Sequence, residues 1–158
     1  MNESGAKFHL LPEAAFTLLD MIVALALSAI LAGIAIPNLM ALAPTYRLNA
    51  AARQIQSELH RIKSQAVAQN IDYRVVFLAP SLYKIEKKTN AHIYQPTGED
   101  KALPEGIVYG NTSAPDISFT PRGTSNSDTI KLCNSRQEGK NVIVFGGTGR
   151  IRVVNVPC

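Results

Sequence analysis

The order of apolar and polar positions divides the chain into three stretches. From Met21 to Ala43 there are 23 residues without a charged side chain, and a helix needs about 20 mainly apolar residues to cross a bilayer. The alternative is a buried core helix, although the rest of the chain is short for enclosing a helix that is apolar on every face. The pattern predicts a membrane-spanning helix within residues 16–43.

Residues 44–70 have the periodicity of an amphipathic helix that continues the first one. Charged side chains alternate with an apolar stripe that is available for burial, and Asn70 is a suitable residue to end the helix. The apolar positions recur at steps of four and three residues and are Leu48, Ala52, Ile55, Leu59, Ile62 and Ala66.

Residues 71–158 change to the pattern of strands and turns and predict a β-rich head. The predicted class is α+β, with a sheet or sandwich packed against the amphipathic helix. Gly146-Gly147-Thr148 joins the last two strands as a hairpin turn. The expected strands, apolar or β-branched runs bounded by turn residues, are 73–78, 82–87, 107–109, 117–119, 129–133, 141–145 and 149–156.

The residues before the apolar run differ from a conventional secretory signal, because residues 1–15 have no apolar core of their own. The segment Ala15-Phe16-Thr17-Leu18-Leu19-Asp20 resembles the prepilin peptidase site of type IV pilins and pseudopilins. The resemblance implies a leader over residues 1–15, cleavage between Ala15 and Phe16, and N-methylation of Phe16. It also implies that the hydrophobic helix stays attached and kinks at Pro37, which removes a backbone hydrogen bond. Ala15 stands where the family usually has Gly, and Asp20 where it usually has Glu.

Asp20 is an ionisable residue near the start of an apolar helix. A carboxylate in a bundle of such helices needs a cation, and the α-amine of Phe16 in a neighbouring subunit supplies one. The family resemblance thus implies a role for Asp20 in filament assembly. The alternative is that Asp20 lies at the membrane interface and is solvated.

Cys133 and Cys158 are the two cysteines of the chain. In an exported head they most simply form one disulfide, which closes a loop around the terminal hairpin. The alternative, a metal site, needs further ligands, and none is evident nearby.

Charge favours binding over catalysis. Without residues 1–15 the chain keeps 15 basic and 10 acidic residues, and a basic head attracts polyanions or anionic surfaces. No Ser-His-acid pattern is present, and Gly146-Gly147-Thr148-Gly149 lacks the Lys-Ser/Thr ending of a phosphate-binding loop. We therefore expect no enzymatic activity, no cofactor and no metal.

The last predicted strand begins with Gly149-Arg150-Ile151-Arg152. Residues two apart on a strand share a face, so both arginines project together while Ile151 turns to the core. Two guanidinium groups on one face suit successive phosphates of a nucleic acid backbone, and we expect Lys140 and Arg136 nearby. Alternatively, the arginines are a solvated strand edge.

This element, together with residues 117–123, resembles the C-terminal half of the GspH/FimT/FimU group of minor pilins and pseudopilins. In the FimT branch, a G-R-x-R element is linked to DNA binding during uptake. The resemblance implies a minor type IV pilin that takes part in assembly near the pilus tip and binds double-stranded DNA in natural transformation. Its implied partners are other pilins, prepilin peptidase and the bacterial inner membrane, with the head in the periplasm and later at the cell surface. The alternative is a GspH-like minor pseudopilin of type II secretion.

Overall fold

The computed structural model of the protein describes residues 17–89, 93–110 and 115–158. The leader expected at residues 1–15 and the processing site at Ala15 and Phe16 lie outside the described residues. The chain divides into two compact units, one ending at Met40 and the other beginning at Ala41, and each is described by itself.

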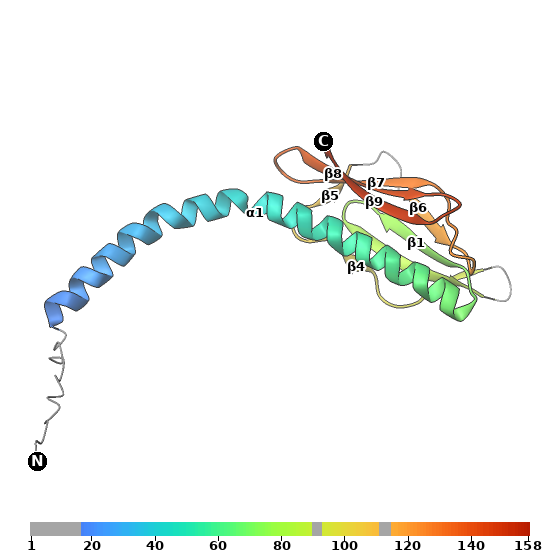
Figure 1. Ribbon diagram of the computed structural model, residues 1–158, viewed down its shortest axis with the longest axis horizontal. Helices are drawn as coiled ribbons and strands as arrows, with labels where there is room; N and C mark the ends of the chain where they lie inside the picture. Colours follow the sequence, from blue (N-terminus) through green and yellow to red (C-terminus); the bar gives the residue numbers. More distant parts are fainter. Residues whose placement is uncertain (1–16, 90–92, 111–114) are drawn as a thin grey trace, which may run out of the picture. The chain divides into compact units, whose positions relative to one another are not determined.

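Helix α1 runs from Leu18 to Gln69 (Figure 1). A reciprocal capping box starts it: Thr17 Oγ1 accepts a hydrogen bond from the Asp20 amide at 3.2 Å, and Asp20 Oδ2 accepts one from the Thr17 amide at 3.1 Å. The helix is continuous through Pro37, and the kink there stays a prediction.

The helix ends where the sequence suggested it would. Asn70 has a φ of 55°, a left-handed conformation that Asn tolerates better than most residues. The Asn70 amide then donates to the Val67 carbonyl and the Ile71 amide to the Ala66 carbonyl, at 3.4 and 3.2 Å. These two bonds form a Schellman motif, which satisfies carbonyl groups of the last turn.

The N-terminal unit presents apolar side chains to its surroundings. Leu19, Leu31 and Ile34 each expose about 70% of their surface, and this part of α1 is long and apolar enough to cross a membrane once. Such a surface needs lipid or neighbouring helices to cover it.

The head contains two antiparallel sheets. Sheet A has the strand order β3-β2-β1-β6, with β4 also pairing with β2, and sheet B has the order β5-β7-β8-β9. The short strands β3 and β4 were not expected, because two or three residues carry no readable alternation. The strands of sheet A are β1 Tyr73–Leu78, β2 Leu82–Lys88, β3 Tyr94–Pro96, β4 Lys101–Ala102 and β6 Asp116–Phe119, and those of sheet B are β5 Val108–Tyr109, β7 Asp128–Cys133, β8 Glu138–Phe145 and β9 Arg150–Pro157.

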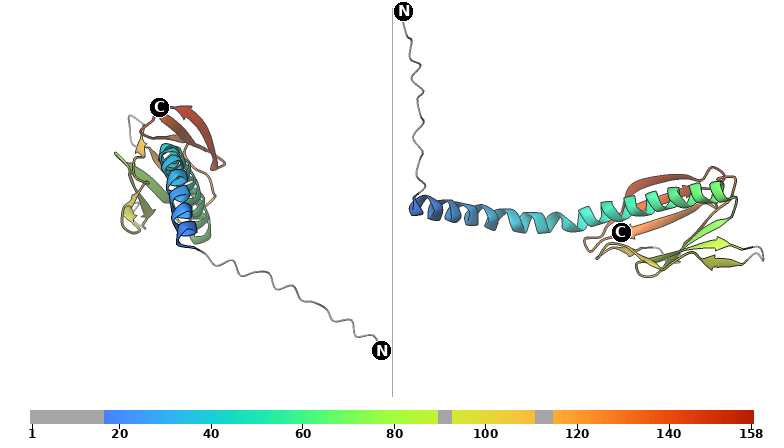
Figure 2. Two further views of the ribbon diagram at one scale, coloured as in Figure 1. Left: turned by 90° about the vertical axis from the view of Figure 1, so that its left-hand side faces the viewer. Right: turned by 90° about the horizontal axis from the view of Figure 1, so that it is seen from below.

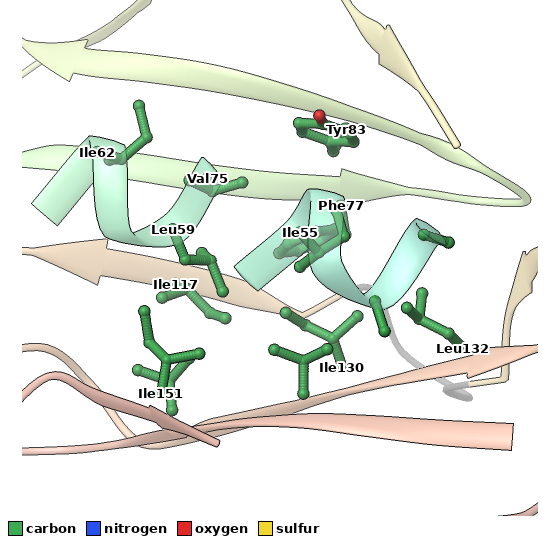
Figure 3. Close-up of a cluster of buried hydrophobic side chains, with 14 of the residues drawn as sticks. Ile55, Leu59, Ile62, Val75, Phe77, Tyr83, Ile117, Ile130, Leu132 and Ile151 are labelled. Atoms are coloured by element: carbon green, nitrogen blue, oxygen red, sulfur yellow. The ribbon is translucent and has the colours of Figure 1, made fainter. Parts of the chain in front are cut away.

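Within the head, α1 lies between the two sheets (Figure 2). Every residue of the apolar stripe expected from the sequence is buried. Figure 3 shows Ile55 and Leu59 of α1 between Val75 of sheet A and Ile130 and Ile151 of sheet B. All residues of this core belong to the second unit, so the head has a hydrophobic core of its own.

Cys133 and Cys158 are bonded, as the sequence predicted, with their Cα atoms 5.9 Å apart. That separation lies within the usual range for disulfides. The bond joins the end of β7 to the residue after β9, so the covalent loop contains the whole β8–β9 hairpin.

Candidate functional site

Arg150 and Arg152 lie on the outer face of sheet B, at the start of β9. Both are exposed, whereas Ile151 between them is 8% exposed and belongs to the core. In the β8–β9 register Arg150 is paired with Phe145 and Arg152 with Ile143. The expected division of this segment into two outward arginines and one inward isoleucine is therefore present.

The turn that precedes Arg150 packs tightly against a second turn. Gly149 has a φ of 57°, and a Cβ built on it would lie 2.5 Å from the Gly123 carbonyl oxygen. Lys63 of α1 fits beside this contact and donates to the carbonyls of Thr148 and Gly149, at 2.9 and 3.1 Å. The helix and both turns therefore meet at one end of the head.

This meeting point gathers four cations, which we call the basic end: Lys63, Arg122, Arg150 and Arg152. Arg122 is exposed in the turn that contains Gly123, and the Gly123 amide donates to the Thr120 carbonyl at 2.9 Å to close that turn. None of the four cations forms an ion pair with any residue that the structure describes.

Carboxylates neutralise several other cations of the head. Arg61 and Lys101 both bond Glu58, and Arg74 and Lys84 both bond Glu86. At the basic end, in contrast, the guanidinium groups are not compensated by a carboxylate among the described residues, so they produce a local positive potential that attracts anions.

Lys140 and Arg136 do not lie beside the arginine pair, and the expected proximity is wrong. Lys140 is opposite Asn155 in the register and donates to its side-chain oxygen at 2.7 Å. Arg136 lies in the β7–β8 turn, at the opposite end of the hairpin from Arg150. Five residues of strand between Arg150 and Asn155 span about 17 Å, so the four residues cannot form one cluster.

The cations that do lie near Arg150 and Arg152 are Lys63 and Arg122. Neither residue had been assigned to the site from the sequence. Arg122 stands in a segment that the family resemblance had already singled out, so a signal for it existed. Lys63 carried no such signal, because only the tertiary packing of α1 against the hairpin turn brings it there.

Asp20, the expected assembly residue, accepts a hydrogen bond from the Thr17 hydroxyl at 2.8 Å in addition to its capping bonds. Its carboxylate is therefore held near the start of α1. The residue is exposed, so the carboxylate remains accessible to a neighbour.

The most buried carboxylate of the head is structural. Glu86 is 4% exposed; burial acts to raise its pKa, but hydrogen bonds from Lys84 and Arg74 outweigh burial and lower the pKa. Arg74 also stacks on the ring of Tyr94, 4.2 Å from its centroid. Within the described ranges no group of three or more His, Cys, Asp or Glu side chains is placed to hold a metal ion.

Comparisons with known proteins identify the fold and the family. The model of the family described as type II transport protein GspH matches residues 51–149. A search of curated proteins returns no match.

Two solved structures share the fold. The minor pseudopilin EpsH from the type 2 secretion system of Vibrio cholerae has a TM-score of 0.58 and 16% identity, over 69% of this chain and 97% of that chain. The type IV minor pilin FimU of Pseudomonas aeruginosa has a TM-score of 0.55 and 20% identity, over 70% and 90%. Because the family model spans more than half of its residues, the chain belongs to the GspH family and is a minor pilin or pseudopilin, a subunit of type IV pili or of type II secretion.

Proposed function

We propose that this subunit is a minor type IV pilin that takes part in assembly near the pilus tip and binds extracellular DNA in natural transformation. The observation that supports DNA binding is the pair of Arg150 and Arg152, which share one exposed face and have no carboxylate partner among the described residues.

The spacing of the pair suits a phosphate backbone. Residues two apart on a strand are separated by about 6.8 Å, so each guanidinium can approach its own phosphate. Arginine presents a planar set of donors that matches phosphate oxygens. Arg122 and Lys63 extend the positive surface beyond β9 and add attraction without sequence specificity.

Assembly rests on the N-terminal unit. Family membership implies packing with other pilins in a filament, and the exposed apolar helix supplies the surface for it. In the proposed sequence of events, prepilin peptidase removes residues 1–15 and the new Phe16 amine is methylated. The helix holds the subunit in the inner membrane with its head in the periplasm until Asp20 pairs with a neighbour's amine.

The DNA proposal is tested by titrating labelled duplex DNA with the full chain in nonionic detergent at several salt concentrations. We expect log affinity to fall linearly with log salt, by about 0.9 per phosphate contact. Arg150→Ala/Arg152→Ala should weaken binding about tenfold or more at low salt and reduce the slope by about 1.8, because two contacts are lost.

A matched control is Arg53→Ala/Lys87→Ala, which removes the same charge from exposed positions with no described partner; it should alter binding far less. Arg136→Ala/Lys140→Ala tests whether DNA covers the whole hairpin or only the basic end. Equal slopes for wild type and the Arg150/Arg152 variant would eliminate the proposed DNA site while leaving the pilin assignment intact.

A minor pseudopilin of type II secretion is the second candidate, and both the name of the matching family and the likeness to EpsH favour it. In that role the head contacts exported protein instead of DNA. Deletion of the gene separates the two: a type IV pilin is needed for pili, whereas a pseudopilin is needed for the appearance of secreted enzymes in the medium.

A further inference from the structure

Phe145 lies on the outer face of sheet B, next to the basic end. It is 41% exposed although Val144 beside it is fully buried, and it is directly opposite Arg150 in the register. Directly opposed residues have Cβ atoms about 5 Å apart, so an apolar ring lies next to an unpaired guanidinium. The ring makes no aromatic or cation–π contact with any described side chain.

A shallow depression adjoins this ring. It has a volume of about 540 Å³ and lies over the ends of β7 and β8, where Ser127, Asp128, Thr129, Ile143, Val144 and Phe145 line it. Ile143 is the register partner of Arg152, so the depression and the two arginines are neighbours on one sheet.

The lining suits a nucleobase better than a phosphate. Ile143 and Phe145 offer apolar contact to a flat ring, and the Ser127 hydroxyl offers a polar edge. Asp128 is opposite the buried Val144 in the register, and its Oδ1 accepts a hydrogen bond from the Thr129 amide at 2.7 Å; its negative charge at the edge of the depression disfavours a phosphate there. Phosphates are therefore directed to the arginines and a base to the depression.

We infer that the depression beside Phe145 accepts an unstacked base, so that the basic end binds single-stranded DNA with part of its affinity coming from stacking on Phe145. This inference rests on the DNA binding proposed above. In a duplex the bases are paired and stacked internally, and their faces are closed to a surface side chain. A single strand exposes them, and sequence-independent binding to aromatic rings is the usual result.

The test compares three probes of equal length: oligothymidylate, the same backbone without bases, and a duplex. The full chain in nonionic detergent should bind oligothymidylate more tightly than the abasic strand. Phe145→Ala should weaken oligothymidylate binding about fivefold or more, without changing the salt slope, because no phosphate contact is lost. Its affinities for the abasic strand and for the duplex should stay at wild-type values.

Two variants control for side effects. Phe145→Leu keeps apolar bulk but removes the ring, and it should behave like Phe145→Ala. Val108→Ala removes another exposed apolar side chain of sheet B, 43% exposed on β5, and it should leave all three affinities unchanged. Thermal unfolding of each variant monitors the fold.

The outcomes separate this inference from the function on which it rests. Equal wild-type affinity for the abasic strand and oligothymidylate would overturn the base site, while an effect of Arg150→Ala/Arg152→Ala on both would keep DNA binding. A uniform loss on all three probes in Phe145→Ala would also overturn it, because stacking cannot act on an abasic strand. Absence of binding to every probe would remove both proposals.

Discussion

At Gly149 the backbone has a φ of 57°, and its α-carbon faces the Gly123 carbonyl so closely that no Cβ fits between them. Two independent requirements thus fall on one residue, the left-handed conformation and the close approach. The position of Arg150 depends on this contact, because the turn sets the direction in which β9 leaves.

Gly149→Ala is therefore expected to destabilise the head by about 2 kcal/mol or more, from backbone strain and from displacement of the Gly123 turn. Chemical denaturation of residues 41–158 measures the loss. Gly98→Ala is the matched control, since a Cβ at Gly98 meets nothing within 4 Å and its φ is not positive. Equal midpoints for the two variants would show that the turns do not depend on this contact.

At the scale of single residues, some positions in the site could be predicted from the sequence and others could not. Alternation along β9 was enough to separate Ile151 from its two arginines, because a strand has a period of two. The same logic could not locate Lys140, since its position relative to Arg150 depends on the length of the hairpin and the face on which it lies. The position of Lys63 near Arg150 could not be predicted either, because it depends on the packing of helix α1 on a turn 85 residues away.

Among the elements, α1 is joined to the sheets by polar contacts as well as by its apolar stripe. Glu58 accepts hydrogen bonds from Arg61 on the same helix and from Lys101 on β4, at 2.7 and 2.5 Å. The hydrogen bond from Arg61, aided by the one from Lys101, holds the pKa of Glu58 below its usual value against the opposing effect of burial.

A group whose pKa is lowered by folding stabilises the fold above its unfolded pKa, and that stability is lost as the pH falls through the folded pKa. Glu58→Gln should therefore cost about 1 kcal/mol at neutral pH, and its difference from wild type should shrink as the pH falls below 4.5, the usual value for Glu. Urea unfolding of the head at several pH values measures this difference.

Glu105→Gln is the control, because the Glu105 carboxylate is 90% exposed and lies 3.8 Å from Arg47; its effect should stay within about 0.5 kcal/mol. If the gap between wild type and Glu58→Gln stays constant down to acid pH, the carboxylate is not a source of stability.

Most elements could be predicted from the periodicity of the sequence, but the arrangement of the strands in the sheets could not. Strands β1, β2, β6, β7, β8 and β9 begin and end within three residues of expectation, because each has local turn residues and an alternating or β-branched pattern. Their division into two sheets on either side of α1 depends on pairing between distant segments, such as β1 with β6. No local pattern records that pairing.

At the scale of the whole molecule, the apolar part of the helix and the globular head differ in how their apolar side chains are covered. The head encloses its own core, whereas the N-terminal unit leaves its apolar side chains without cover among the described residues. Such a subunit is complete only in a membrane or in a filament. In the assembly proposed above, Asp20 lies in the part of the helix that passes from the membrane into the filament.

Substitutions at Asp20 can separate its charge from its capping bonds. Asp20→Asn keeps an oxygen acceptor for Thr17 but loses the charge, and we expect its level in sheared filaments to fall about tenfold or more, because an unpaired amine is left in the bundle. Asp20→Glu restores the carboxylate and should assemble. Immunoblots of the membrane and filament fractions give the ratio, and normal incorporation of Asp20→Asn would exclude a charge-based role.

If the subunit stands near the pilus tip, as proposed above, the Cys133–Cys158 bond has a mechanical consequence. Arg150 and Arg152 lie inside the covalent ring that this bond closes. A ligand pulling on them loads β7 through two covalent branches, one along β8 and one back through Cys158. If force pulled the hairpin away from the sheet, the chain between β7 and the arginines could extend less far with the disulfide intact than with it reduced. Tension would therefore reach the filament after a shorter extension.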